Sequence, residues 1–192
     1  MPLSGPRAQC ERPGRQHDQE SRVSSFSSAG TDLTTDRLVL RIWSAGELAA
    51  VLGGTHRAHW AEDFPADGDR VIAGFVTGSP DALHAYGHRL VVERDTGLVV
   101  GSIGLLWPPT DGAVEIGYGI VPSRRGRGYA SEATRALAQF ALTAPGVHTV
   151  HAQVELSNAA SVRVLEKAGL RRWSSDADTA RFRMTAADPT PR

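Results

Sequence analysis

The segment from Ala113 to Leu156 constrains the fold most, because it has the pattern of a strand, a helix and a second strand. Ala113 to Val121 alternates with a period of two residues, which predicts a strand. Gly128 to Thr143 carries an apolar stripe at helical spacing, and Val147 to Leu156 returns to the strand pattern. Two strands joined by a crossover helix lie parallel in one sheet. The segment therefore predicts a parallel strand pair.

The remaining predicted strands and helices are bounded by turn residues, and the predicted strands fit antiparallel pairing. A Gly-containing turn at Asp95-Thr96-Gly97 predicts a hairpin, and Gly169 marks the end of a helix. The predicted strands are 37–43, 88–94, 98–107, 170–173 and 180–185, and the predicted helices are 45–52, 69–77 and 159–168. We therefore expect a mixed α/β (α+β) fold with a mostly antiparallel sheet of about six to seven strands and about four flanking helices.

The pattern indicates one folded domain with a tail at each end. Residues 1–32 are rich in Ser, Arg, Gly, Pro and Gln, and have few large apolar side chains. Such a segment buries too little apolar surface to offset the entropy of ordering it. We expect a disordered tail over 1–32, a single domain over 33–185 and a second short tail over 186–192.

Composition excludes several classes of protein. The 21 basic and 21 acidic residues balance, which argues against nucleic acid or a membrane surface as partner. Cys10 is the only cysteine, so an intrachain disulfide and a cysteine-based metal site are excluded, and we expect no metal. No apolar run reaches the ~20 residues of a membrane helix, and the N-terminus lacks the pattern of a secretory signal. A cytoplasmic protein is expected.

The turn between the predicted strand at 113–121 and the helix after it has the features of an anion site. Gly126 and Gly128 permit positive φ, so that consecutive N–H groups can converge at the start of the helix. Arg124, Arg125 and Arg127 add positive charge at the rim, and a diphosphate fits such a site. The loop lacks the Gly-Lys-Ser/Thr ending of a P-loop and the three glycines of a dinucleotide fingerprint. A plain basic connector and an RNA-binding loop are the alternatives.

These residues carry a resemblance to a known family. Arg125-x-x-Gly128-x-Ala130 is similar to the Gln/Arg-x-x-Gly-x-Gly/Ala signature of the GNAT N-acetyltransferase superfamily. The segments TDRLVLR, EIGYGIVPSRRGRGYASEA and ELSNAASVRVLEKAGL occur in the same order as in that superfamily. They most resemble its branch with the ribosomal-protein N-terminal acetyltransferases. The likeness extends over about residues 33–185.

The resemblance implies acetyl-CoA as co-substrate. Backbone amides of one loop would hold the pyrophosphate, namely those of Arg125, Gly126, Arg127, Gly128, Tyr129, Ala130 and Ser131. The backbone of Ile120 and Val121 would pair with the pantetheine arm, and Asn158 would bind the pantetheine or the thioester end. The sheet would be splayed between the strand ending at Val121 and the strand beginning near Val147, with the coenzyme in the gap.

Transfer of an acetyl group to an amine requires a neutral amine and therefore favours a general base. Glu115 is the first candidate, because alternation places it on one strand face with Gly117 and Gly119, where small residues leave room for a guest. A surface glutamate with no role is the alternative interpretation. His151 is a second candidate base, since the usual pKa of histidine lies near neutral pH.

The departing thiolate needs a proton. Many members of the family place a tyrosine in the last helix for this purpose, but the corresponding residue here is Leu165. In the branch that this chain most resembles a serine three residues after the asparagine can serve, and that residue is Ser161. The alternatives are that water donates the proton, or that Asn158 and Ser161 only complete the first turn of the helix.

The resemblance also places the acceptor cleft beside the loop between the first two helices. Trp60, Asp63 and Phe64 lie in that loop and suit a cationic amine, and His56 and His59 are weaker candidates for substrate contacts. The rings of Trp60 and Phe64 fit a core position equally well. The acceptor can be a protein N-terminus or a small-molecule amine, and the oligomeric state stays open. A non-catalytic acyl-CoA-binding or sensing module is the alternative function.

Overall fold

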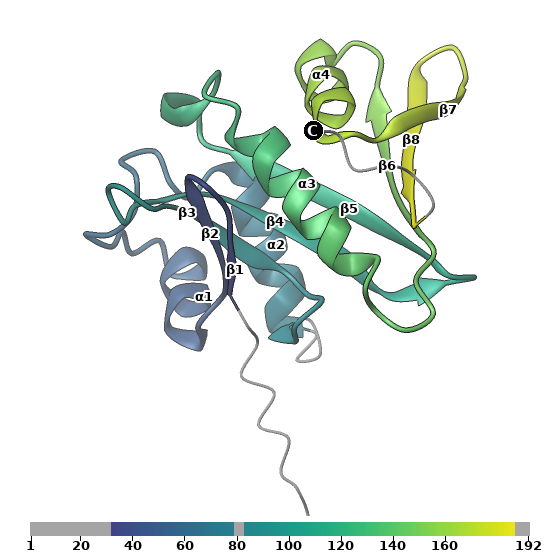
Figure 1. Cartoon of the computed structure of the whole chain (residues 1–192). Coiled ribbons are helices and arrows are strands. Elements are labelled where there is room, and N and C mark those ends of the chain that lie inside the picture. The colour runs from purple at the N-terminus through teal and green to yellow at the C-terminus, as the bar shows by residue number, and fades with distance from the viewer. Residues whose placement is uncertain (1–31, 79–82, 187–192) are drawn as a thin grey trace, which may run out of the picture.

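The computed structural model describes residues 32–78 and 83–186, which form one open mixed sheet with helices on both faces (Figure 1). The strand order is β1-β2-β3-β4-β5-β6-β8-β7. All neighbouring strands are antiparallel except β5 and β6, the parallel pair predicted from the sequence. The strands are β1 (Leu33–Thr34), β2 (Leu38–Ile42), β3 (Arg89–Glu93), β4 (Val99–Thr110), β5 (Ala113–Ile120), β6 (Thr149–Glu155), β7 (Arg171–Ser175) and β8 (Thr179–Thr185).

The helix ends follow from local sequence. Ser44 and Glu47 form a reciprocal capping box at the start of α1, and Gly169, at φ +96°, ends α4. The helices are α1 (Ala45–Leu52), α2 (Asp67–Gly78), α3 (Tyr129–Ala141) and α4 (Ala159–Ala168), and a short 3-10 helix, η2 (Pro122–Arg124), precedes α3.

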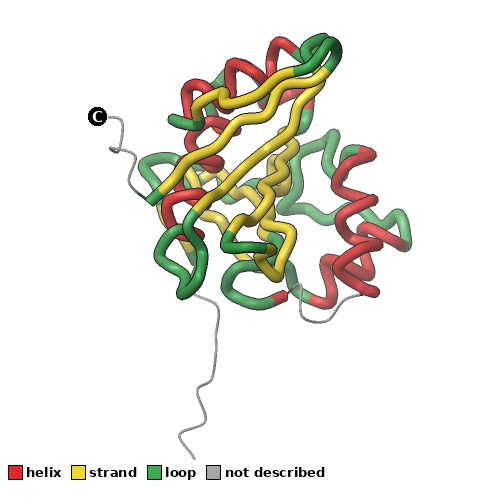
Figure 2. Tube along the Cα trace, turned by 90° about the vertical axis from the view of Figure 1, so that its right-hand side faces the viewer, coloured by secondary structure: helices red, strands yellow, loops and turns green. Residues whose placement is uncertain are grey.

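α1 and α2 contact each other on one face of the sheet, and α3 and α4 contact each other on the opposite face. Figure 2 shows helices on opposite sides of the strands. On one face, the buried Ser102 of β4 donates a hydrogen bond to Asp69 of α2. On the other face, the guanidinium of Arg89 in β3 lies 5.5 Å from the ring centre of Phe140 in α3. Apolar side chains are buried on both sides, which explains why the central strands read as continuous apolar runs.

The predicted fold is confirmed, with small differences at the ends of elements. The described residues form eight strands rather than six or seven, because Leu33–Thr34 pairs with β2. Two residues are too few to show an alternating pattern. α2 begins at Asp67, two residues before the predicted start, and β4 continues to Thr110 past an irregularity in its register after Leu106.

Some expectations fall on residues that the structure does not describe. The predicted tails, 1–32 and 186–192, lie outside the described ranges except for Asp32 and Ala186, and Cys10 lies outside them too. Within the ranges that are described, no helix has both the length and the apolar character needed to cross a membrane.

Candidate active site

The parallel strands β5 and β6 separate part of the way along the sheet. Their ladder consists of the first residues of each strand and ends at the pair Glu115 and His151. Beyond this pair β5 continues to pair with β4, while β6 continues to pair with β8. The two strands diverge from there, as Figure 1 shows, with α3 and α4 beside the opening. The splayed sheet implied by the resemblance is therefore present.

The open edge of β5 carries backbone groups that face away from β4. Val121 N–H donates to Val100 O at 3.0 Å, so the N–H and C=O of the preceding residue, Ile120, point toward the opening. The carbonyl of Ile120 accepts a hydrogen bond from Arg125 Nε at 2.9 Å. The side chain of Arg125 therefore lies at the open edge, next to the groups that the resemblance assigns to the pantetheine arm.

The loop between η2 and α3 has the conformation expected of an anion site. Gly126 and Gly128 adopt φ of +75° and +82°, as their positions in the motif predict. Gly128 is the N-cap of α3, and no side chain from the described residues caps this helix, so its first N–H groups face the loop. Tyr129 is 8% exposed, so its ring belongs to the core and not to the surface of the loop.

Arg37, at the start of β2, fixes this loop from outside. Its Nη1 donates to Arg127 O at 2.8 Å, and its guanidinium lies 5.1 Å from the ring centre of Tyr129. Its other nitrogens bind the carboxylate of Glu132 in the first turn of α3 at 2.7 and 2.6 Å. Partial burial disfavours ionisation of Glu132, but hydrogen bonds from Thr35 and Arg37 outweigh it and lower the pKa of the carboxyl. No sequence pattern indicated a role for Arg37 or Glu132.

Two of the three arginines of the loop, Arg124 and Arg127, lie close to the carboxylate of Glu93. Glu93 of β3 is 1% exposed, and its Oε1 lies 3.1 Å from Arg124 Nε and 3.7 Å from Arg127 Nη1. A second acid, Asp63, accepts hydrogen bonds from the N–H and Oγ of Ser123 at 2.8 and 2.6 Å. These contacts connect the loop to β3 and to the α1–α2 loop.

Glu115 lies at the point where the strands diverge. Val114 and Ile116 are buried on one face of β5, whereas Gly117 and Gly119 are exposed on the other, so the predicted alternation is confirmed without an intervening bulge. Glu115 is half-buried on the face of the glycines, the side of the sheet that α1 and α2 occupy. His151, also half-buried, is its direct neighbour on β6. The two candidate bases thus lie side by side.

The first turn of α4 faces the same opening. Asn158 is the N-cap residue, and its Oδ1 accepts the N–H of Ser161 at 3.0 Å. The carbonyl of Ser161 accepts a hydrogen bond from the hydroxyl of Tyr118 in β5 at 3.2 Å. Leu165 is 1% exposed and belongs to the core. Tyr118 was not among the predicted site residues, because alternation alone assigned it to the core face.

The three residues predicted to contact the acceptor lie in different environments. The rings of Trp60 and Phe64 are 3% and 1% exposed and pack edge to face, 5.1 Å apart, in the core. Asp63 is half-buried and is held by Ser123. His56 and His59 are exposed, and they bind the carbonyl of Ala61 and the carboxylate of Glu47. In this conformation the loop offers no open aromatic wall.

Comparison with known proteins relates this geometry to a family. Residues 37–171 match the acetyltransferase (GNAT) domain family. The chain is 36% identical over 81 residues to the uncharacterized N-acetyltransferase YjdG of Bacillus subtilis, a match that covers 42% of this chain and 48% of YjdG. The chain thus spans about half the length of the curated relatives it matches.

Two solved structures show the same fold. An acetyltransferase (GNAT family) from Bacillus anthracis superposes with a TM-score of 0.60 and 22% identity, over 81% of this chain and 98% of the other. The ribosomal α-N-protein acetyltransferase RimL in complex with coenzyme A superposes with a TM-score of 0.59 and 16% identity, over the same shares of the two chains.

Proposed function

Because the chain belongs to the acetyltransferase (GNAT) domain family, we propose that it moves an acetyl group from acetyl-CoA directly to a primary amine while both are bound. The acceptor is a protein N-terminus or a small-molecule amine. The observation that carries this proposal is the divergence of β5 and β6, which has Glu115 at its vertex and the glycine loop at the far end of β5. Coenzyme A bound to RimL, a protein of the same fold, supports the choice of coenzyme.

The coenzyme would lie along the open edge of β5. N–H groups from Arg125 to Ser131 would hold the pyrophosphate, where the positive end of the dipole of α3 adds to them. The pantetheine arm would pair with the backbone of Ile120 and Val121, and the amide of Asn158 would bind near the thioester. For Ile120 O to accept from the arm, Arg125 would release it and turn toward the phosphates.

The proposed reaction needs the amine as a free base. At pH 7 about one α-amine in ten is neutral, but only about one lysine amine in 2,500, from their usual pKa values. The amine lone pair attacks the thioester carbonyl, the C–S bond breaks, and the proton lost by nitrogen passes to the carboxylate of Glu115, directly or through water. His151, the neighbour of Glu115, is the alternative base. Holding both reactants together contributes several kcal/mol more through proximity.

We assign protonation of the leaving thiolate to Ser161, beside which the hydroxyl of Tyr118 lies. Ser161→Ala is expected to lower kcat about three- to tenfold and no further, because water can protonate a thiolate in place of a side chain. Steady-state rates at saturating acetyl-CoA measure this effect, with Ser157→Ala, just before the N-cap, as control. An unchanged kcat would mean that Ser161 only completes the first turn of α4.

The contacts of Arg37 predict an effect on coenzyme binding rather than on chemistry. Arg37→Ala removes the bonds to Arg127 O and Glu132, so the loop loses its preformed shape. We expect the KM for acetyl-CoA to rise about tenfold with kcat nearly unchanged, the size expected for one partly exposed charge-assisted bond.

Arg94→Ala is the matched control for this prediction. Arg94 binds the carbonyls of Thr35 and Asp36 at the same corner of the domain, without contacting the loop. Equal KM values for acetyl-CoA in the two variants would contradict a role for Arg37 in shaping the loop.

A panel of amines tests the activity itself. Acetyl-CoA is supplied with peptides of differing N-termini and with small amines, and the release of free thiol is followed. An enzyme releases thiol only when a suitable amine is present, whereas a binding or sensing module shows coenzyme binding in calorimetry and no thiol release with any amine. The second result would overturn the proposed function.

A further inference from the structure

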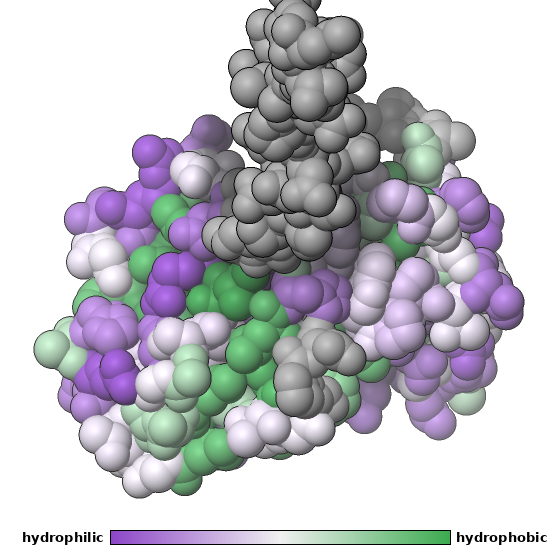
Figure 3. Space-filling model, turned by 90° about the horizontal axis from the view of Figure 1, so that it is seen from below, coloured by the Kyte–Doolittle hydropathy of each residue, from purple (hydrophilic) through white to green (hydrophobic). Residues whose placement is uncertain are grey.

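The outer half of the sheet has one face without a helix. α4 packs against β6 and β7, and Figure 2 shows the opposite face of the outer strands turned to the viewer with no helix over it. In the view from below (Figure 3), hydrophobic residues gather in the middle and to the left, and the side on which Figure 1 draws these strands is mostly hydrophilic. The face of this half of the sheet that no helix covers is therefore mostly polar.

A row of residues runs across this open face from the vertex of the site. Glu115 pairs with His151, His151 pairs with Arg183, and Arg183 pairs with Arg171. Residues directly opposite on neighbouring strands share a face, so all four side chains are on the side of the sheet where the amine would bind. Arg181, two residues before Arg183 on β8, lies on the same face beside Gln153.

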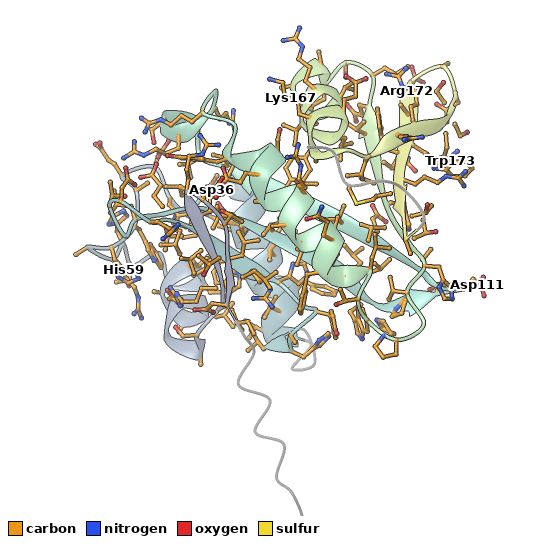
Figure 4. All side chains as sticks on the ribbon, viewed as in Figure 1. Asp36, His59, Asp111, Lys167, Arg172 and Trp173 are labelled. Carbon is orange, nitrogen blue, oxygen red and sulfur yellow. The ribbon has the colours of Figure 1, made fainter. Side chains whose placement is uncertain are left out.

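An exposed tryptophan belongs to the same surface. Trp173 is 52% exposed, and the guanidinium of Arg183 lies 5.3 Å from its ring centre. Figure 4 places Trp173 at the outer side of the β7–β8 pair, away from α4. We call Arg181, Arg183 and Trp173 the cationic face.

The charge of the cationic face is not neutralised by close acids. Neither Arg181 nor Arg183 has a carboxylate within 4.0 Å among the described residues. Asp176, at the β7–β8 turn, interacts with Arg181 electrostatically, but Thr179 and backbone amides occupy its carboxylate. Because the whole chain has a formal net charge of zero, this local excess of positive charge does not reflect a generally basic protein.

We infer that the cationic face binds the acceptor, and that the acceptor is a peptide with acidic residues a few positions after its reactive N-terminal amine. The inference rests on the proposed function. Adjacent strands lie ~4.8 Å apart and residues two positions apart on one strand lie ~6.8 Å apart, so Arg183 and Arg181 stand ~10 and ~12 Å from Glu115 on the sheet. An extended peptide advances ~3.3 Å per residue, so its third to fifth residues reach the two arginines.

The order of charges along the row favours a peptide over a nucleic acid. The row begins with the carboxylate of Glu115, which attracts a cationic amine and repels a phosphate. Beyond His151 it reaches Arg183, with Arg181 on the same strand and face, and both arginines attract carboxylates. A peptide with an N-terminal amine followed by acids has the complementary order. A nucleic acid is negative throughout its length, so its phosphates would also meet the carboxylate of Glu115.

Matched peptides test the inference. Two acceptors share their first two residues and carry either three glutamates or three glutamines at positions three to five. The expected KM is about tenfold lower for the glutamate peptide, the size of two or three exposed charge pairs, and the difference shrinks as salt is raised. In the double variant Arg181→Gln/Arg183→Gln this preference disappears, while the KM for acetyl-CoA stays the same.

Arg172→Gln is the matched control, because Arg172 is next to Arg171 on β7 but lies on the opposite face, over the ring of Phe182. It keeps the preference for the glutamate peptide. Equal KM values for both peptides in the unmodified protein, or an equal loss in Arg172→Gln, would overturn the inference while leaving the acetyltransferase proposal intact.

Binding of a fluorescent glutamate peptide, followed by anisotropy, gives a readout that does not need turnover. Saturable binding that the double variant loses supports the cationic face as a peptide site. Displacement of the peptide by a single-stranded RNA that binds more tightly would assign the face to nucleic acid instead. Absence of both peptide binding and thiol release, with acetyl-CoA still bound, would remove the inference together with the proposed function.

Discussion

Replacing Gly128 with valine is expected to weaken acetyl-CoA binding by several orders of magnitude while the domain stays folded. Gly128 has φ +82° as the N-cap of α3, a conformation that a β-branched residue strongly disfavours. A β-carbon at this position would also lie 3.3 Å from Nη2 of Arg37, the residue that holds the loop. The substitution therefore moves the N–H groups that we propose bind the pyrophosphate.

The size of this effect follows from the bonds that are lost. Two or three hydrogen bonds to a charged group contribute about 1.5–3 kcal/mol each, and every 1.4 kcal/mol is about a tenfold change in Kd. Backbone strain at a single residue costs about 1–3 kcal/mol of stability. That cost lies within the ~5–15 kcal/mol by which domains are stable, so binding should suffer far more than folding.

Calorimetry with acetyl-CoA and thermal unfolding separate the two effects. The coenzyme should raise the Tm of the unmodified protein by mass action and leave that of Gly128→Val unchanged. Gly146→Val is the control, because Gly146 has a similar φ of +79° in the turn between α3 and β6, with no atom within 4 Å of the position of its β-carbon. Pantetheine without phosphates should bind both variants alike. If the Gly128→Val protein folds and binds acetyl-CoA with normal affinity, the loop does not bind the pyrophosphate and only connects β5 to α3.

The features that sequence alone predicted are those set by neighbours along the chain. Positive φ at Gly126 and Gly128, the phase of β5 that places Glu115 with the glycines, and the parallel β5–β6 pair all follow from short patterns. Membership of the GNAT superfamily, suggested by three short segments, is confirmed by the match over residues 37–171. The closer likeness to ribosomal-protein acetyltransferases stays a resemblance.

The features that sequence did not predict depend on residues far apart in the chain. Arg37 meets Glu132 across a separation of 95 residues, and no local pattern indicates which of many arginines will find that partner. The row from Glu115 to Arg171 exists only because strand register aligns four strands. The sequence is compatible with Trp60 either in the wall of the acceptor cleft or in the core. Its burial depends on tertiary packing, which no local pattern predicts.

Glu115→Gln is the second substitution with a large expected effect, and it acts on chemistry rather than on binding. Glutamine keeps the shape of the side chain but cannot take the proton of the amine. General bases contribute about 10²- to 10⁴-fold, so kcat should fall by that range. The Kd for acetyl-CoA should stay within a few-fold, because the loop that we propose binds the pyrophosphate lies at the other end of β5.

The pH dependence of the remaining activity identifies the base. Without one, the reaction depends on amine that is already neutral, so kcat/KM of the variant should rise about tenfold per pH unit until the pKa of the acceptor amine is reached. His151→Gln, at the neighbouring position on β6, is the matched comparison. If Glu115→Gln keeps full turnover at every pH and His151→Gln loses it, the base is the histidine. If both lose it, the pair acts together, since the two residues lie opposite each other in the last rung of the β5–β6 ladder.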